Sequence, residues 1–309
     1  MHTSASKQLR DLLRQPGPLI CPGVIAPIFA ILAEAAGFES IYATGAGISN
    51  ANLGLPDLGL MDMSEMLQVT QNIVQSVSKP VIADIDTGYG NALNVTRTIQ
   101  SFIRAGVGGV QIEDQINPKR CGHFEDKTVV SSQEMVERLI AAVEARDGHD
   151  LVLIARTDAL APEGLSAAIE RAHLYVQAGA DVIFIEAPTS VDQLRTIGRE
   201  FSVPLVVNMV EGGKTPMLSA EALTEMGFKV ILYANAVLRM AMAASRRALR
   251  EIRETGTTEG ILAEMDSWES RQGAVKLDAW LDIDKNVRGK AQVVFGASSN
   301  QYDRGPSDA

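Results

Sequence analysis

The sequence predicts an α/β protein of the (β/α)8 TIM barrel class, and two features of the chain lead to this prediction. Short apolar runs rich in valine and isoleucine recur along it, and segments with helical spacing separate them. Runs that are apolar almost throughout are typical of strands buried on both faces of a parallel sheet. The runs lie at 19–24, 40–44, 80–86, 109–114, 151–157, 181–187, 204–210 and 229–234. Eight strand–helix repeats match a barrel. A doubly wound sheet is the alternative, but the chain has no clear dinucleotide fingerprint.

The segments between these runs have the apolar spacing of helices. The clearest lie at 63–77, 92–106, 131–145 and 164–179. Two of them end in Ala-Gly directly before the next apolar run, as a helix C-terminus often does. After Ala234 the chain is helical again, and its last stretch is rich in Gly and Ser. We therefore predict one barrel domain over 1–285, which includes C-terminal helices, and a C-terminal tail over 286–309.

Composition narrows the classes of partner and compartment. The 309 residues carry a formal net charge of −10, which does not favour nucleic acid or an anionic membrane as a partner. Two cysteines do not make a disulfide framework, so a reducing compartment is expected. The N-terminus lacks the apolar segment of a signal peptide, and no run is long enough to span a membrane. We expect a cytoplasmic protein.

Polar side chains follow most of the predicted strands at their C-terminal ends. In a barrel these ends converge on the face that carries the active site. Each one taken alone is explained equally well as a helix cap or a turn residue, but their repetition favours a site. They are Thr44, Asp84, Asp86, Glu113, Asp114, Arg156, Asp158, Glu186, Asn208 and Glu211.

Asp84 and Asp86 form the first candidate site, for a metal ion. Two carboxylates at i and i+2 of a strand point to the same face, where they would repel each other. Mg²⁺ relieves that repulsion, since it prefers one or two carboxylates with water and substrate oxygens. Glu113, at the end of the next strand, strengthens this interpretation. The alternative is that Asp86 caps a Gly-rich turn while an arginine holds Asp84.

Two further strand ends suit a carboxylate ligand. Arg156 offers a guanidinium for a bidentate contact, although an ion pair with Asp158 is a serious alternative. Tyr42 precedes the run Thr44-Gly-Ala-Gly47, whose small residues would let backbone N–H groups approach an oxyanion. An ordinary tight turn is the alternative there.

The stretch Ile116–Lys127, INPKRCGHFEDK, holds the second candidate for chemistry. Cys121 lies beside Lys119, Arg120 and His123, and nearby positive charge lowers the pKa of a thiol. We therefore interpret Cys121 as an acid–base group rather than a solvated thiol. Cys21 lies inside an apolar run and is interpreted as a small core residue.

The motifs TGAG, GLPDLG, DIDTGYG, IEDQ, KRCGH and ARTDA occur in this order. In order and spacing they resemble the isocitrate lyase and phosphoenolpyruvate mutase superfamily over about residues 8–285. KRCGH is similar to the motif of its carbon–carbon lyase branch, and within that branch the chain resembles the methylisocitrate lyase and 2,3-dimethylmalate lyase-like enzymes. The resemblance implies a barrel whose last helix is exchanged between subunits in a homotetramer, a dimer of dimers.

The resemblance also implies the roles of individual residues. The metal, Mg²⁺ with Mn²⁺ as an alternative, would be bound near Asp84, with Asp57, Asp86 and Glu113. The substrate would contact Thr44, Gly45, Ala46, Arg156, Glu186, Asn208 and Arg239. Cys121 would donate and accept the proton at carbon, and the other catalytic candidates are Lys119, Arg120, His123 and Tyr42.

The implied reaction is metal-dependent cleavage of a small carboxylate, a 2-hydroxy di- or tricarboxylate. The substrate would be of the 2-methylisocitrate type or of the 2-alkylmalate or 2,3-dimethylmalate type, and the products a 2-oxo acid such as pyruvate and a carboxylic acid. Trp268 stands where methylisocitrate lyases carry an arginine, which favours a smaller dicarboxylate unless Arg271 substitutes. An oxaloacetate decarboxylase or hydrolase is the alternative, but such hydrolases carry serine where this chain has Ala159.

Overall fold

The strands close into a barrel, as predicted. The computed structural model describes residues 4–120, 122 and 127–302, with side chains up to residue 295. All strand pairs are parallel, and β1 pairs with both β2 and β8. The strands are β1 (Leu19–Val24), β2 (Ile41–Ala43), β3 (Val81–Asp84), β4 (Gly109–Glu113), β5 (Val152–Thr157), β6 (Val182–Ile185), β7 (Leu205–Asn208) and β8 (Val230–Tyr233). Each lies within one predicted apolar run, so the (β/α)8 fold class is confirmed.

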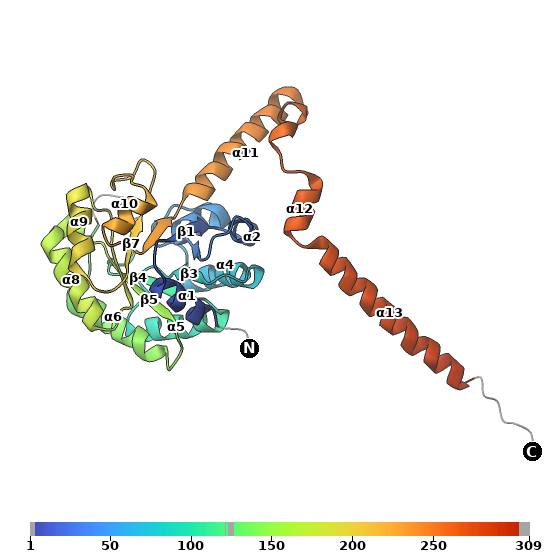
Figure 1. Cartoon of the computed structure of the whole chain (residues 1–309), viewed down its shortest axis with the longest axis horizontal. Helices are drawn as coiled ribbons and strands as arrows, with labels where there is room; N and C mark the ends of the chain where they lie inside the picture. Colours follow the sequence, from blue (N-terminus) through green and yellow to red (C-terminus); the bar gives the residue numbers. More distant parts are fainter. Residues whose placement is uncertain (1–3, 121, 123–126, 303–309) are drawn as a thin grey trace, which may run out of the picture. The chain divides into compact units, whose positions relative to one another are not determined.

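Helices surround the strands (Figure 1). The barrel helices are α1 (Ala5–Arg14), α2 (Pro27–Ala35), α3 (Gly45–Ile48), α4 (Met63–Ser76), α5 (Ala92–Ala105), α6 (Ser132–Ala145), α7 (Leu160–Glu163), α8 (Leu165–Gln177), α9 (Val191–Glu200) and α10 (Ala220–Glu225). A short π-helix, η1 (Ser49–Leu53), follows α3. Local chemistry fixes the ends: Asp62 and Glu65 form a capping box at α4, and Gly106 ends α5 with φ 85°.

Helix α1 covers the N-terminal ends of the strands. Its Leu9 is fully buried in the apolar core inside the barrel, together with Leu19 of β1 and Val152 of β5. Arg10 donates two hydrogen bonds of 3.0 Å to the carboxylate of Asp181. The opposite, C-terminal ends of the strands are therefore the end of the barrel at which a site can open.

The chain continues beyond the barrel through α11 (Ala236–Thr255) into a second compact unit, residues 250–309. That unit contains the 3-10 helix η2 (Glu259–Glu264), α12 (Trp268–Ala274) and α13 (Leu277–Tyr302). The predicted domain boundary at residue 285 falls inside α13 and stays a prediction, as does exchange of a helix between subunits. Within the described residues, no helix is long and apolar enough to cross a membrane.

Candidate functional site

A small cavity opens at the C-terminal ends of the strands, where the sequence predicts the site. Nine predicted site residues line it: Tyr42, Thr44, Ala46, Asp57, Asp84, Lys119, Arg156, Glu186 and Asn208. They come from β2, β3, β5 and β7, from the segments that follow β2 and β6, and from the segment after β4. The barrel topology therefore gathers residues that lie up to 166 positions apart in the sequence, from Tyr42 to Asn208.

Asp84 ends β3 and is held by neighbouring donors. The backbone N–H groups of Gly45 and Asp86 donate to its two carboxylate oxygens, each at 3.3 Å. The Tyr42 hydroxyl also bonds this carboxylate, and burial together with the charge of Asp84 raises the pKa of Tyr42 well above its usual value. Gly45 is needed here, because a Cβ atom on it would lie 3.0 Å from an oxygen of Asp84.

Lys119 lies among the carboxylates that the sequence predicts as metal ligands. Its Nζ atom is 3.0 Å from Oδ1 of Asp86 and forms a short ion pair with Asp57. Burial opposes the charge on Lys119, but Asp86 and Glu113 outweigh it and raise the pKa of the ammonium well above its usual value. Burial raises the pKa of Asp86 to about 6, and Lys119 offsets only part of that rise. Asp86 also has φ 48°, a strained backbone conformation of the kind often found at functional sites.

The donor set fits a hard divalent cation that uses one or two carboxylates. In the described part of the chain, no three acidic, histidine or cysteine side chains are grouped to hold a metal ion together. However, Oε1 of Glu113 is buried and accepts no hydrogen bond from any described residue. Burial raises the pKa of Glu113 well above its usual value, and Arg156 counteracts this rise only partly. Carboxylate oxygens of this kind, with water and substrate oxygens, suit Mg²⁺.

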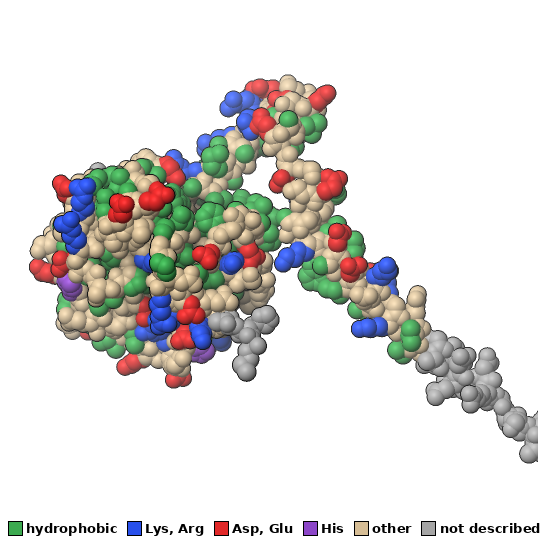
Figure 2. Space-filling view, in the orientation of Figure 1, with side chains coloured by type: hydrophobic (Ala, Val, Ile, Leu, Met, Phe, Trp, Pro, Cys, Tyr) green, Lys and Arg blue, Asp and Glu red, His purple; other side chains and the backbone are tan. Residues whose placement is uncertain are grey.

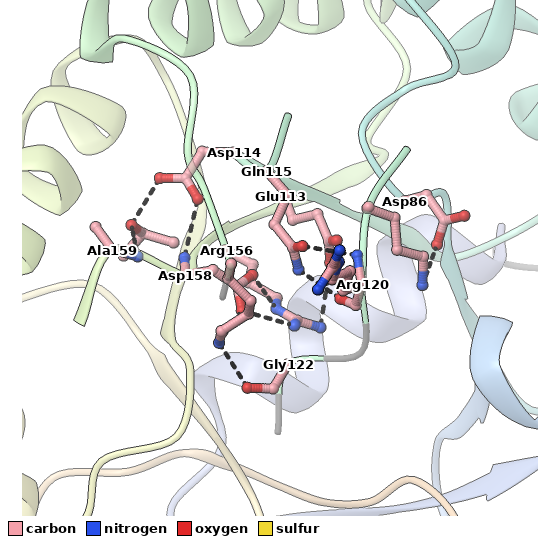
Figure 3. Close-up of polar contacts among 12 residues, drawn as sticks. Asp86, Glu113, Asp114, Gln115, Arg120, Gly122, Arg156, Asp158 and Ala159 are labelled. Atoms are coloured by element: carbon pink, nitrogen blue, oxygen red, sulfur yellow. Dashed lines mark hydrogen bonds and ion pairs between the residues drawn. The ribbon is translucent and has the colours of Figure 1, made fainter. Parts of the chain in front are cut away.

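Arg156 extends from β5 into the cavity and is held there by two acids. Its Nε and Nη2 atoms donate to Asp158 at 3.0 and 3.1 Å, and Nη1 is 3.2 Å from Glu113 (Figure 3). Burial would raise the pKa of Asp158, but Arg156 and Lys127 outweigh it and lower that pKa to about 2. The ion pair between Arg156 and Asp158, one of the two interpretations of the sequence, is therefore present, and it orients a guanidinium at the cavity wall.

The segment after β4 borders the cavity through Lys119 and Gly122. Gln115 bonds the backbone of Arg120 twice: its Nε2 donates to the carbonyl at 2.7 Å, and its Oε1 accepts from the N–H at 2.8 Å. Gly122 lines the cavity, and a Cβ atom there would lie 2.3 Å from Nη2 of Arg156. Cys121 and His123 lie outside the described residues, so their roles stay predictions.

Three residues to which sequence reasoning gave no catalytic, substrate or metal role are important here: Gln115, Lys127 and Asp158. Lys127 is buried and bonds both Asp158 and the carbonyl of Gly122. A signal was present for Asp158, which lies two residues from Arg156 within ARTDA. Gln115 ends the motif IEDQ and Lys127 ends the stretch Ile116–Lys127, but the sequence did not give their partners, because these contacts depend on how the segment folds over the barrel.

Arg239, a predicted substrate contact, does not line this cavity. Arg239 of α11 donates to the carbonyl of Glu211 at 2.6 Å and borders a separate cavity with Met240 and Arg246. Arg271 of α12 lies over the ring of Trp268, 4.2 Å from its centroid. The roles proposed for Arg239, Trp268 and Arg271 therefore stay predictions.

The chain is similar to known proteins over most of its length. The family model described as phosphoenolpyruvate phosphomutase matches residues 9–253. A 2-methylisocitrate lyase of Aeropyrum pernix is 41% identical over 292 residues, which cover 94% of each chain. A 2,3-dimethylmalate lyase of Eubacterium barkeri is 37% identical over 286 residues, which cover 93% of this chain and 98% of that one.

Solved structures with a similar fold also cover most of the chain. Oxaloacetate acetylhydrolase in complex with 3,3-difluorooxalacetate superposes with a TM-score of 0.86 at 37% identity, covering 92% of this chain and 97% of that one. A phosphonopyruvate hydrolase complex with oxalate and Mg²⁺ reaches a TM-score of 0.80 at 30% identity, covering 93% and 98%. The chain therefore belongs to the phosphoenolpyruvate mutase/isocitrate lyase superfamily, in which the sequence relatives named here are carbon–carbon lyases.

Proposed function

We propose that the protein is a Mg²⁺-dependent carbon–carbon lyase that cleaves a 2-hydroxy di- or tricarboxylate to a 2-oxo acid such as pyruvate and a carboxylic acid. The observation that carries the proposal is the position of Arg156. Its buried guanidinium, fixed by Glu113 and Asp158, borders the same cavity as Asp84. A cation and a group of hard oxygen ligands at one cavity suit a substrate with two carboxylates.

The residues divide into binding and chemistry. Asp84, with Asp86, Glu113 and Asp57, would hold the metal, which when bound polarises the oxygen at C2 of the substrate. Arg156 binds a substrate carboxylate, and the backbone at Gly45 and Ala46 approaches its oxygens. Thr44, Glu186 and Asn208 complete the wall of the cavity; Asn208 Oδ1 is buried and accepts no hydrogen bond within the described chain.

The chemical steps are assigned to Lys119, Arg156 and Cys121. A carboxylate at the cavity would accept the proton of the C2 hydroxyl as this oxygen becomes the carbonyl of the 2-oxo acid; the C2–C3 bond breaks, and its electrons pass into the second carboxylate as an enediolate. Lys119 and Arg156 stabilise that negative charge, because they are fixed cations in a site shielded from water. Cys121 then protonates the carbon, and Gly122, the next residue in the chain, lines the cavity. Tyr42, Arg120 and His123 would tune these groups.

A smaller dicarboxylate of the 2,3-dimethylmalate type is the preferred substrate. Two observations support this choice: the likeness to a 2,3-dimethylmalate lyase, and Trp268 in place of an arginine. The second candidate is an oxaloacetate hydrolase, which the likeness to oxaloacetate acetylhydrolase supports. Ala159 opposes it, because this position is fully buried and offers no hydroxyl. We also propose that the enzyme works as a cytoplasmic homotetramer.

A substrate panel tests the proposal. The purified enzyme with Mg²⁺, or with Mn²⁺ in parallel, is given 2-methylisocitrate, isocitrate, 2-methylmalate, 2,3-dimethylmalate and oxaloacetate, and products are identified by chromatography. We expect the highest kcat/KM for one of the hydroxy acids, with release of a 2-oxo acid. Acetate and oxalate from oxaloacetate as the dominant products would establish the hydrolase instead.

A further inference from the structure

Lys127 is an unusual side chain for the position it occupies. It follows the undescribed part of the segment after β4, yet its side chain is only 2% exposed. Its ammonium lies 2.5 Å from the carbonyl oxygen of Gly122 and 2.7 Å from Oδ1 of Asp158. Burying an ammonium is costly unless it is paired and hydrogen-bonded, so these two contacts account for its position.

Asp158 is a rigid acceptor for that ammonium. Its backbone N–H donates to Oδ1 of Asp114 at 2.9 Å, and Oδ2 of Asp114 accepts from the Tyr175 hydroxyl of α8 at 2.7 Å. Its carboxylate also holds Arg156 with two hydrogen bonds. Asp158 therefore links Lys127 to the guanidinium that borders the cavity, while the core at α8 keeps Asp158 in place.

Gly122 is the other end of the link. A Cβ atom added there would lie 2.3 Å from Nη2 of Arg156 and 2.5 Å from Oε1 of Glu186, so the backbone of Gly122 packs directly on the binding residues. Gln115 fixes the chain at Arg120, on the N-terminal side of Gly122. The ammonium of Lys127 donates a hydrogen bond to the carbonyl of Gly122 itself.

We propose that Lys127 is a positioning residue that fixes the backbone at Gly122 against Arg156, and thereby sets the shape of the cavity wall beside this guanidinium. Charge neutralisation of Asp158 alone does not account for Lys127, because Arg156 already gives that carboxylate two charge-assisted hydrogen bonds. Lys127 does not itself line the cavity, so its effect passes through Gly122 and Asp158. The kinetic part of this inference rests on the proposed function.

The test compares Lys127→Met with Lys229→Met. Lys229 is a matched control, because its ammonium likewise donates two hydrogen bonds, to the backbone carbonyls of Gln15 and Gly17 at 2.7 Å each, far from the cavity. For Lys127→Met we expect kcat to fall by a factor of about 30 or more while KM changes less than threefold, since Arg156 keeps Glu113 and Asp158 as partners. Lys229→Met should keep both constants within twofold.

A second measurement does not need a substrate. Trypsin cleavage after Arg120, followed by mass spectrometry, reports how firmly the segment is held, and it should be at least tenfold faster in Lys127→Met than in the wild type or in Lys229→Met. Should Lys127→Met fail to fold, Lys127→Gln/Asp158→Asn removes both charges together and is expected to show the same acceleration. Wild-type cleavage rates in a folded Lys127 variant would overturn the proposal. Failure of the substrate panel with accelerated cleavage would count against the proposed function and leave the positioning role standing.

Discussion

At the scale of single residues, the site consists of carboxylates that form ion pairs with buried cations. Asp57, Asp86 and Lys119 form one group, and Glu113, Arg156 and Asp158 form the other. The sequence predicted that acids and Arg156 would lie at strand ends, because that follows from barrel geometry. It did not predict the contact of Lys119 with Asp57, since nothing local specifies a pairing over 62 positions.

Removing Lys119 tests the first of these groups. Lys119→Met leaves Asp57 and Asp86 without their ammonium, and breaking a buried ion pair of this kind costs about 3 kcal/mol of unfolding free energy. The measurement is urea denaturation in EDTA. Arg120→Met is the control, because exposed Arg120 bonds Gln115 through its backbone, and it should stay within about 0.5 kcal/mol of the wild type. Equal stability of Lys119→Met and the wild type would contradict this account.

The two cysteines should differ sharply in reactivity. Burial raises the pKa of the Cys21 thiol to about 12 from 9.0, against a smaller opposing effect of Ser40. Because the folded value is the higher one, the neutral thiol stabilises the fold fully below pH 9 and loses this contribution as the pH rises toward 12. At pH 8 we expect Ellman's reagent to titrate no thiol in folded Cys121→Ser, and one after unfolding. Rapid reaction of Cys21 in the folded variant would show that the thiol is accessible.

At the scale of elements, apolar runs and helical spacing predicted most of the barrel. Each strand lies inside its run because both of its faces are buried, and the capping side chains Asp62, Asn91 and Ser131 begin helices where the sequence has suitable residues. The short helices α3 and η1 were not predicted, since TGAG reads equally well as a turn. The stretch after residue 286 has the composition of a tail, yet α13 is helical to Tyr302.

The contact between α9 and the end of α10 depends on one glycine. A Cβ atom on Gly198 would lie 1.6 Å from the carbonyl oxygen of Met226, and backbone on both sides leaves little freedom to adjust. Gly198→Ala should therefore lower the unfolding free energy by about 3 kcal/mol. Gly273→Ala is the control, since no atom lies within 4 Å of its added Cβ and α12 should gain helix propensity. Calorimetry that finds both variants equally stable would refute the packing argument.

At the scale of the whole molecule, α13 carries apolar side chains that its own compact unit leaves exposed. Trp280, Ile283, Val287 and Val294 lie on one face by helical spacing and are between 54% and 68% exposed. Hydrophobic side chains, drawn in green, are visible along this segment in Figure 2. Exposed apolar surface of this extent marks an interaction site. A second copy of the chain is the partner that the proposed homotetramer supplies.

Charge on this face should therefore break the assembly. Val287→Glu is expected to lower the mass measured by light scattering below that of a tetramer, because burying an unpaired carboxylate in an interface is costly. Lys285→Glu, on the opposite side of α13 by helical spacing, serves as the control and should keep the tetramer. A wild-type protein that is monomeric at micromolar concentration would refute the tetramer directly.

The most direct test of the central claim is the stoichiometry of products from 2,3-dimethylmalate. Wild-type enzyme with Mg²⁺ should release pyruvate and propionate in equal amounts, and this release should stop when EDTA removes the metal. Cys121→Ser should bind the substrate with similar affinity but lose turnover by about a thousandfold or more. Wild-type turnover by Cys121→Ser, or no 2-oxo acid from this or any related hydroxy acid, would contradict the assignment.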